Sequence, residues 1–260
     1  MANPEHIIFL HIPKTGGSSL DWVMSKKYKN HTVIKLKPEE ILDFNYYKLA
    51  NQNLYLSGHM GYGIHSKSIK DNQVKYITML RNPVERVISF YYWASIKSKV
   101  EIGLSNFVSQ DTPFRNNTQT KLLSIDDGVI KLPKMSESQM LNKAKYTIKH
   151  KITCLGLTEY FDESMLLFKK VFNWSSNYYL RIRENSSRPL TSSIDDSTIQ
   201  LIRDKNYLDI ELYNYATQIF KENIRSNNIN LSVGLKIFQL NNLVFKHLWM
   251  AGRKIKGILK

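Results

Sequence analysis

Short apolar runs bounded by polar or turn-forming residues recur through the N-terminal half of the chain and again near residue 155. β-Branched and aromatic residues are common in these runs, and both types fit the covered, pleated surface of a buried strand. The pattern predicts its clearest central strand at Val74–Leu80. The other predicted strands are Ile7–Leu10, His31–Leu36, Leu54–Ser57 and Ile152–Leu157.

Apolar residues at helical spacing lie between and after these strands. The predicted helices are Ser18–Lys27, Lys37 to about Tyr47, Ser136–Lys149, Ser164–Phe172 and a long or broken helix from Ser193 to about Arg225. Asn82 can cap a helix and Pro83 can occupy its first position, so a further helix begins directly after Val74–Leu80. Strands that alternate with helices predict one large α/β domain.

Two segments depart from this alternation. Residues 97–140 are the least periodic part of the chain and include a polar string, RNNTQT. A long irregular segment inside a compact domain is functional or mobile, and we interpret it as a lid on the substrate side. Residues 226–260 resemble a basic amphipathic helical extension, which can lie on an anionic membrane or pack against a partner. Packing against its own domain is the simpler interpretation.

Charge and cysteine content limit the partners and the cellular compartments that fit this chain. The 260-residue chain has a formal net charge of +15, which favours nucleic acid, acidic glycan, a membrane surface or a multiply charged cofactor as partner. Its one cysteine, Cys154, excludes an intramolecular disulfide framework, allows a reducing compartment and lies in an apolar run typical of core packing. The sequence lacks a signal-peptide pattern and an apolar run of about 18 residues, so we expect a cytoplasmic protein.

The stretch that follows the first strand, HIPKTGGSS at residues 11–19, has the composition of a phosphate-binding loop. A strand, a glycine-containing turn and a helix start form an anion site, because the first N–H groups of the helix point at the ligand. Glycines let the backbone approach closely, a lysine supplies a mobile cation, and hydroxyls donate hydrogen bonds. The candidate residues are Lys14, Thr15, Gly16, Gly17, Ser18 and Ser19.

This loop differs from the usual nucleotide-triphosphate loop, in which a lysine follows the second glycine as G-x-x-x-x-G-K-[ST]. Here Lys14 precedes the glycines, and no Gly-Lys-Ser or Gly-Lys-Thr occurs in the chain. A tight strand-to-helix turn with an incidental lysine is the structural alternative. The segment PKTGGSS, residues 13–19, closely resembles the 5′-phosphosulfate loop of sulfotransferases, enzymes that use 3′-phosphoadenosine 5′-phosphosulfate (PAPS).

A histidine lies in the glycine-rich turn GHMGYG, residues 58–63, directly after the third strand. Loops at strand ends often carry function, and histidine is the natural general base for a hydroxyl acceptor at neutral pH. His59 is therefore the candidate catalytic base, although a structural or merely exposed histidine is the alternative. His65 is the second candidate, whereas His31 lies within a strand and is interpreted as structural.

Arg81 lies at the carboxyl end of the central strand, where open α/β sheets bind ligands and where a guanidinium suits a phosphate. A salt bridge is the structural alternative. The series RNPVERVISFYYW, residues 81–93, resembles the 3′-phosphate motif of sulfotransferases, which pairs an arginine with a serine eight residues later. The resemblance implies that Arg81 and Ser89 hold the 3′-phosphate. An ion pair with Glu85 explains Arg86 equally well, and the final YYW is assigned to core packing.

Two further segments extend the resemblance. AKYTIKHKITCLGLTEYFDESMLLF, residues 144–168, resembles heparan sulfate 2-O-sulfotransferases and their bacterial relatives, in which Gly-x-Thr-Glu lies near the cofactor, so Thr158 is a candidate. In the family, a basic loop corresponding to YLRIRENSSRPLT folds over the adenosine and 3′-phosphate, with Arg188 as the best match. A solvated charged loop is the alternative. The resemblance covers about residues 6–225.

The resemblance implies a sulfotransferase domain over residues 1–225, with a P-loop-like three-layer α/β/α fold, a central, mainly parallel sheet and a bacterial source. His59 would take the proton of an acceptor hydroxyl, and Lys14 would neutralise charge on the leaving phosphate of PAPS. A carbohydrate hydroxyl is favoured as acceptor over a peptide tyrosine or small molecule. A P-loop kinase and a non-catalytic polyanion-binding protein are the alternatives outside this reaction. Neither nucleic acid nor a metal ion is expected as partner.

Overall fold

The computed structural model describes residues 4–66, 68, 73–98, 102–110, 112, 115–129, 134–182 and 191–258. The described part of the chain contains a five-stranded sheet in the order β2-β3-β1-β4-β5, and every pairing in it is parallel. The strands are β1 (His6–Leu10), β2 (Thr32–Leu36), β3 (Leu54–Gly58), β4 (Val74–Leu80) and β5 (Ile152–Leu157). The predicted strands and the mainly parallel sheet are confirmed.

Burial along the strands follows their position in the sheet. All residues of β1 and β3 are buried, because both strands have a neighbour on each side and helices above and below. β2 lies at the edge and alternates between half-buried and exposed residues until Leu36. Nearly continuous apolar runs are typical of parallel strands that are covered on both faces. The nearly continuous burial of β4 therefore explains why Val74–Leu80 was the clearest central strand in the sequence.

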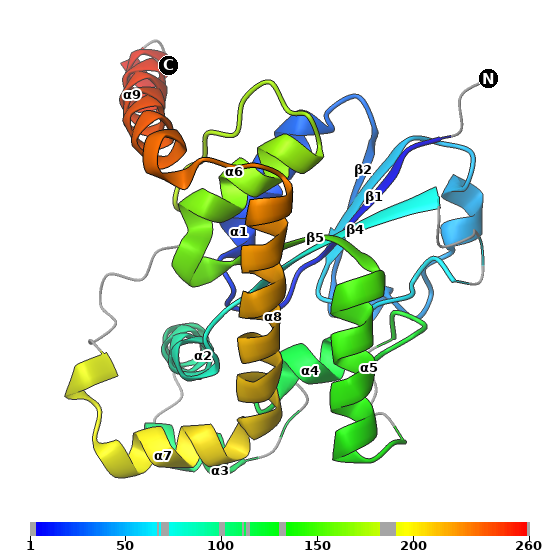
Figure 1. The fold of residues 1–260 in the computed structure, drawn as a ribbon, viewed down its shortest axis with the longest axis vertical. Helices are drawn as coiled ribbons and strands as arrows, with labels where there is room; N and C mark the ends of the chain where they lie inside the picture. The colour runs from blue at the N-terminus through cyan, green and yellow to red at the C-terminus, as the bar shows by residue number, and fades with distance from the viewer. Residues whose placement is uncertain are drawn as a thin grey trace.

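Helices cover both faces of the sheet, so the fold is a three-layer α/β/α arrangement, as predicted. In Figure 1, α1 and α6 lie on one side of the sheet and α4 and α5 on the other. The helices are α1 (Gly17–Lys27), α2 (Pro83–Ser98), α3 (Leu104–Ser109), α4 (Thr118–Leu123), α5 (Glu137–His150), α6 (Phe161–Val171), α7 (Asp196–Lys205), α8 (Tyr207–Ser226) and α9 (Leu231–Ile258).

One predicted helix differs from the structure, and another takes one of its two predicted forms. The helix expected from Lys37 to Tyr47 is replaced by two short 3₁₀ turns, Pro38–Glu40 and Tyr46–Leu49. Asn45 precedes the second turn in an extended conformation, and asparagine is among the residues that favour turns over helix interiors. The long helix expected over 193–225 is broken at Asn206, whose side-chain amide donates to the Ile202 carbonyl at 2.9 Å. That break was one of the two predicted forms.

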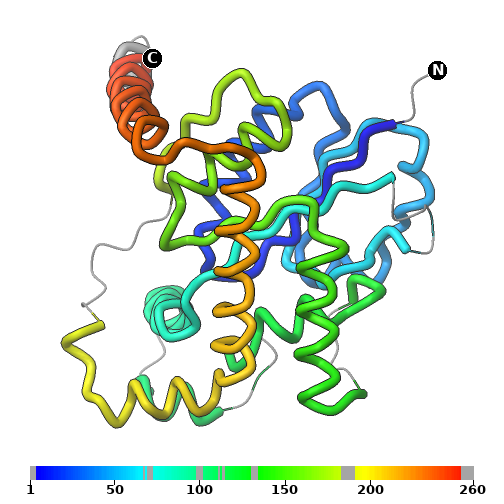
Figure 2. Tube along the Cα trace, in the orientation of Figure 1, coloured from blue at the N-terminus to red at the C-terminus, as the bar shows by residue number. Residues whose placement is uncertain are grey.

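The C-terminal segment forms α9, which lies outside the three layers and beside α6 (Figure 2). Phe238 and Asn242 are buried on its inner face, so packing of this helix against its own domain is confirmed. Cys154 is also buried, which confirms its assignment to the core, and burial raises the pKa of its thiol. No helix in the described part of the chain is both long enough and apolar enough to cross a membrane.

Candidate active site

The loop between β1 and α1 has the conformation of an anion-binding turn. Lys14 and Gly16 both have a positive φ, 69° and 75°, which folds the backbone sharply before the helix begins. Glycine tolerates this region without strain, whereas a non-glycine residue held there often marks a functional site. Gly16 occupies the cap position of α1 and has no side chain to cap it, and the first turn has no acidic residue. The first N–H groups of α1 are therefore suited to an anionic ligand.

Gly17 is required by packing as well as by ligand approach. A Cβ at this position would lie 2.1 Å from Cδ2 of His11, whose ring stacks on Phe9. Any side chain at Gly17 would therefore displace the His11 ring. From the sequence, Gly17 was expected to let the backbone approach a phosphate closely. The structure shows a second reason for a glycine, because the His11 ring fills the space that a Cβ would occupy.

The three hydroxyls predicted to cradle a phosphate differ in their surroundings. Thr15 is fully buried, and its hydroxyl donates to the Ile12 carbonyl at 2.8 Å. The Ser19 hydroxyl accepts a hydrogen bond from the Ile182 N–H at 3.0 Å and thereby joins α1 to the segment around residue 180. Ser18, in contrast, lines an open cleft. The Thr15 and Ser19 hydroxyls thus hydrogen-bond to protein groups in this structure, and their predicted place on a phosphate stays a prediction.

His59 lies immediately after β3, next to the end of β1. Its Nδ1 is 2.6 Å from the carbonyl oxygen of His11, and the rings of His11 and His59 are 4.5 Å apart between centroids. A carbonyl oxygen can only accept a hydrogen bond, so Nδ1 carries the proton and Nε2 carries the lone pair. The end of β1 therefore selects the tautomer of His59 in which Nε2 can accept a proton.

A cleft of about 510 Å³ opens beside this histidine pair. It lies at the carboxyl ends of β1, β2 and β3, where ligands bind in open α/β sheets. The residues that line it are His11, Ser18, Asp21, Trp22, Ser25, Lys35, Leu36, Lys37, Ser57, Gly58, His59 and Ile182. The structure thus brings His59 and Ser18 of the phosphate loop to the same cleft.

Asp21 is a largely buried carboxylate on the cleft wall. Burial alone would raise its pKa, but hydrogen bonds from Lys35, Tyr55 and Ser57 outweigh burial, and the pKa lies below its ordinary value. Lys35 Nζ is 2.5 Å from Oδ2 of Asp21, and the Tyr55 hydroxyl donates to Oδ1 at 2.8 Å. Asp21 therefore joins α1 to β2 and β3 as a charged group.

We expect Asp21→Asn to lower the free energy of unfolding at pH 7 by about 1–3 kcal/mol, the usual cost of losing hydrogen bonds to a charged group. A carboxylate whose pKa is lower in the folded state stabilises the fold. Its full contribution is present above the unfolded-state pKa, about 3.9, and is lost as the pH falls through the folded-state pKa. The difference between wild type and Asp21→Asn should therefore shrink on acidification. Urea unfolding at a series of pH values measures it, with the exposed Asp43→Asn as control.

Arg81 follows β4 and lies against the phosphate loop. Its guanidinium donates to the Lys14 carbonyl at 3.2 Å and to Oε2 of Glu85 at 3.3 Å, and its Nε is 4.0 Å from Oε1 of Glu159. The predicted loop and the predicted arginine, distant in sequence, are therefore in direct contact. The salt bridges that we considered as an alternative are also present, so Arg81 has both anionic partners and a position beside the phosphate loop.

Ser89 lies on α2 four residues after Glu85, so the two residues share one face of the helix. Glu85 is the residue of α2 that contacts Arg81, which places Ser89 one turn further along that same face. Glu85 also lines a smaller cleft of about 280 Å³ between the start of α2, α7 and α8. The pairing of Arg81 with Ser89 on a 3′-phosphate stays a prediction, and Arg188 lies outside the described residues.

Lys14 carries its ammonium toward α2, away from the 510 Å³ cleft. Its Nζ lies 5.5 Å from the centroid of the Trp93 ring, over which Lys97 Nζ also lies at 5.0 Å. Trp93 is 39% exposed, so its assignment to core packing is wrong, and the ring instead offers its face to cations. The flexible four-carbon side chain of Lys14 gives the ammonium a wide range of positions around the loop.

His65 is excluded as the general base by its surroundings. Its side chain is fully buried, and its Nδ1 is 2.8 Å from the hydroxyl of Tyr76, so it belongs to the core of the sheet. His31 precedes β2 and lies 3.3 Å from Glu5, in agreement with its structural assignment. Thr158 contacts the loop directly, since its hydroxyl is within hydrogen-bond distance of the carbonyls of Thr15 (2.7 Å) and Leu80 (3.0 Å).

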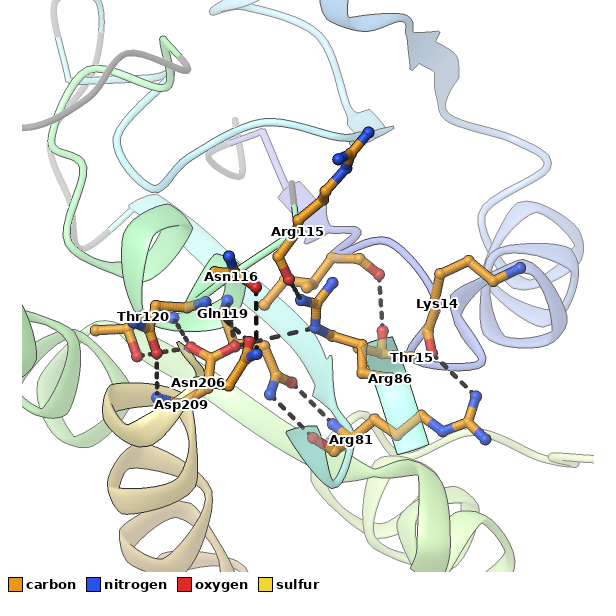
Figure 3. Close-up of polar contacts among 12 residues, drawn as sticks. Lys14, Thr15, Arg81, Arg86, Arg115, Asn116, Gln119, Thr120, Asn206 and Asp209 are labelled. Carbon is orange, nitrogen blue, oxygen red and sulfur yellow. Dashed lines mark hydrogen bonds and ion pairs between the residues drawn. The ribbon is translucent and has the colours of Figure 1, made fainter. Parts of the chain in front are cut away.

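A buried polar network holds the backbone of Arg81 in place (Figure 3). Gln119 accepts from the Arg81 N–H and donates to the Arg81 carbonyl, both at 2.9 Å. Asp209 on α8 accepts from the N–H groups of Gln119 (3.1 Å) and Thr120 (2.7 Å), and so caps the start of α4. The network fixes α4 between α8 and the end of β4.

Arg86 supplies the counter-charge in this network. Both Arg86 and Asp209 are fully buried, with Arg86 Nε 3.9 Å from Oδ2 of Asp209. Burial lowers the pKa of Arg86 to about 10, opposed by the attraction of Asp209, so Arg86 stays charged at neutral pH. Arg86 is thus a structural residue in an ion pair, as considered, and the structure gives Asp209 as a partner that the sequence did not indicate. The polar string at residues 115–120 is likewise largely buried around Asp209, and the lid assigned to 97–140 stays a prediction for the rest of that segment.

The sequence interpretation missed several residues of the cleft. His11 was part of the quoted motif, yet the spacing of the chain gives no sign that its carbonyl and ring contact His59. Asp21, Lys35 and Lys37 were not singled out as site residues in the sequence. Their common feature, a place near the carboxyl end of β1 or β2, becomes visible once the strand order is known. Among the described residues, no group of three or more His, Cys, Asp or Glu is arranged to hold a metal ion.

A glycine-containing loop and an arginine that meet at the carboxyl ends of parallel strands define an α/β protein of the phosphate-binding class. Comparison with known sequences identifies the family: the profile described as "Sulfotransferase family" matches residues 1–216, which is most of the chain. The chain belongs to this family. The resemblance to sulfotransferases that the motifs indicated is confirmed.

Curated relatives have names that specify a glycan. The chain is 31% identical over 179 residues to heparan-sulfate 6-O-sulfotransferase 2 of Gallus gallus, which covers 56% of this chain and 44% of that protein. It is 24% identical over 273 residues to heparan-sulfate 6-O-sulfotransferase 1-B of Danio rerio. This match covers 83% of this chain and 66% of that protein. The chain thus spans less than two thirds of each relative. Both relatives are 6-O-sulfotransferases, whereas the motif comparison named 2-O-sulfotransferases.

Two solved structures also match over most of the chain. A mouse sulfotransferase, SULT7A1, complexed with PAP is 14% identical and covers 91% of this chain and 89% of its own, with a TM-score of 0.41. A sulfotransferase from Alicyclobacillus acidocaldarius is 12% identical, and the match covers 90% of this chain and 99% of that one, with a TM-score of 0.49. The three-layer parallel fold described above stands on its own strand order and pairings.

Proposed function

We propose that the protein is a PAPS-dependent sulfotransferase that transfers a sulfuryl group to a hydroxyl of a carbohydrate. One observation carries this proposal: Arg81 donates directly to the carbonyl of Lys14, which joins the candidate 3′-phosphate residue to the phosphate loop. The donor set fits PAPS, because a glycine-capped helix start, a lysine and an arginine are groups that bind phosphates. PAPS would supply the sulfuryl group, and the binding residues would be Lys14–Ser19 with Arg81 and Ser89.

His59 would act as the general base. The His11 carbonyl holds the proton on Nδ1, so Nε2 is the atom that takes the proton of an acceptor hydroxyl. His59 lies on the wall of the cleft together with Ser18 of the loop, so the acceptor and the donor would meet at the ends of β1 and β3. Positioning of this kind supplies much of the rate enhancement in a group transfer.

Lys14 would place positive charge beside the phosphate that leaves. Its backbone is part of the loop, and its ammonium over Trp93 lies between the loop and α2. A cation aimed at developing negative charge stabilises the transition state more than the ground state. The ammonium would move from the Trp93 ring to the donor phosphates when they are bound.

The acceptor would be a glycan that carries its own negative charge. Lys35 and Lys37 line the cleft next to Trp22, and the names of the curated relatives specify heparan sulfate. Lysines attract sulfate and carboxylate groups, and an aromatic ring suits the face of a sugar ring. A peptide tyrosine or a small molecule remains the alternative acceptor. A cytoplasmic location and a bacterial source stay predictions.

Thermal unfolding with three ligands tests the proposal. We expect 3′-phosphoadenosine 5′-phosphate (PAP) to stabilise by about 2.7 kcal/mol at a concentration one hundred times its Kd. AMP should stabilise less, because it lacks the 3′-phosphate. Arg81→Lys should weaken PAP binding about tenfold or more, since a lysine cannot replace a forked guanidinium. The exposed Arg225→Lys serves as the matched control.

Two outcomes would contradict the proposal. Stabilisation by ATP–Mg²⁺ but not by PAP would favour a kinase, and equal affinity of Arg81→Lys and wild type for PAP would remove Arg81 from the site. Labelled PAPS offered with heparan-type glycans, tyrosine peptides and small phenols then identifies the acceptor class. Incorporation into peptide alone would contradict the carbohydrate assignment.

A further inference from the structure

Helix α9 presents two different apolar faces. The inner face packs against the domain: Phe238 is buried, and the Asn242 side chain accepts a hydrogen bond from the Tyr179 N–H at 2.9 Å. Phe245 lies on the same side, with its ring 6.1 Å from Trp22 of α1 between centroids. These contacts fix the orientation of α9 on the molecule and so determine which of its residues face outward.

The outer face carries a continuous apolar stripe. Its members follow one another at intervals of three or four residues, so they share one side of the helix. They are Val233 (54% exposed), Ile237 (55%), Leu240 (63%), Val244 (50%) and Leu248 (69%). Single exposed apolar residues are ordinary on protein surfaces, but a contiguous row on one helix marks an interaction surface.

The charge of this segment indicates what the stripe contacts. Residues 231–260 contain no Asp or Glu. Their basic residues are Lys236, Lys246, Arg253, Lys254, Lys256 and Lys260. A second copy of the same helix would bring like charges together, which disfavours a homodimer through this face. An anionic surface, in contrast, is complementary to both the basic residues and the apolar stripe.

We propose that α9 is a peripheral membrane anchor that lies in the plane of an anionic lipid bilayer, with the stripe from Val233 to Leu248 inserted at the boundary of headgroups and acyl chains. An amphipathic helix rich in lysine, with leucine, phenylalanine and tryptophan among its apolar residues, has the composition of such interfacial helices. Anionic headgroups attract the lysines, and the apolar stripe adds affinity by leaving water. This inference goes beyond the proposed sulfotransferase activity and does not depend on it.

The anchor would also position the cleft. Trp22 lines the 510 Å³ cleft and contacts Phe245 on the inner side of α9. α6 packs against α9 and carries Lys169 and Lys170 in its last turn. The cleft therefore borders the helix that lies on the lipid, so an acceptor presented at the membrane surface would reach it.

Vesicle flotation of the full chain tests the anchor. We expect binding to vesicles of about 30% phosphatidylglycerol in phosphatidylcholine, weaker binding to pure phosphatidylcholine, and release by high salt. Leu240→Gln with Val244→Gln should lower the partition constant about tenfold or more, because two inserted side chains become polar without any change of charge. Leu42→Gln with Ile96→Gln removes two apolar residues elsewhere that are more exposed than Leu240 and Val244, and should leave binding unchanged.

Circular dichroism and the PAP thermal shift would show that each variant is folded, and Leu248→Gln alone replaces the double variant if it is not. Equal flotation of wild type and the α9 variant would overturn the proposal, as would the absence of binding to anionic vesicles. Self-association in sedimentation that the same variant abolishes, without vesicle binding, would assign the face to a second copy and would also overturn it. None of these outcomes depends on sulfuryl transfer.

Discussion

His59→Ala is expected to lower the rate of sulfuryl transfer about 10²–10⁴-fold, the usual contribution of a general base, while PAP binds as it does to wild type. The two effects separate because His59 follows β3 and contacts the carbonyl of His11, whereas Arg81, the candidate 3′-phosphate residue, follows β4 on the other side of β1. A transfer assay with labelled PAPS measures the rate, and the thermal shift with PAP measures donor binding.

His150→Ala is the matched control for this experiment. His150 is an exposed residue near the end of α5, and its ring contacts only Tyr146 among the ring contacts described. Its replacement should leave both rate and binding unchanged. An unchanged rate for His59→Ala with the true acceptor would remove His59 as the base. A loss of PAP binding equal to the loss of rate would instead assign His59 to the donor site.

Asp209→Asn is expected to lower the free energy of unfolding by about 3–5 kcal/mol, the cost of removing one partner of a buried ion pair. Arg86, with a pKa lowered to about 10, stays charged at pH 7 and would lose its buried counter-ion. The N–H groups of Gln119 and Thr120 would also exchange a charged acceptor for a weaker one. Urea unfolding followed by circular dichroism measures the change.

Asp204→Asn removes the same charge from an exposed position on α7 and should change the free energy of unfolding by at most about 0.5 kcal/mol. Equal stability of the two variants would mean that the Arg86–Asp209 pair does not stabilise the fold. Because Gln119 holds both the N–H and the carbonyl of Arg81, the surviving folded fraction of Asp209→Asn should also bind PAP more weakly than wild type.

The sequence was most informative where a short stretch of neighbouring residues determines the local structure. β1 and β4 were predicted because continuous apolar runs suit strands covered on both faces, and the phosphate loop because glycines, a lysine and a helix start converge on one short stretch. Arg81 was placed correctly at the end of β4, since its position follows from the end of the apolar run. Each of these predictions needed only neighbours in sequence.

Other features depended on side-chain contacts that the sequence pattern does not show. Nothing near residue 209 indicates that Asp209 caps α4, because Thr120 precedes it by 89 residues. The hydroxyls of Thr15 and Ser19 hydrogen-bond to the Ile12 carbonyl and the Ile182 N–H, partners that the motif does not indicate, and their place on a phosphate stays a prediction. Trp93 belongs to an apolar run, yet its ring lies outside the core, next to Lys14 and Lys97.

The central place of β1 has a consequence for how the chain folds. β1 is synthesised first, but it pairs with β3 and β4, and the Thr78 hydroxyl that donates to the Leu10 carbonyl is 68 residues away. A nascent chain therefore exposes an apolar strand until β4 has left the ribosome, and pairings over such separations form slowly. The phosphate loop at residues 11–19 likewise gains its contacts with Arg81 and Thr158 only after those distant residues have been synthesised.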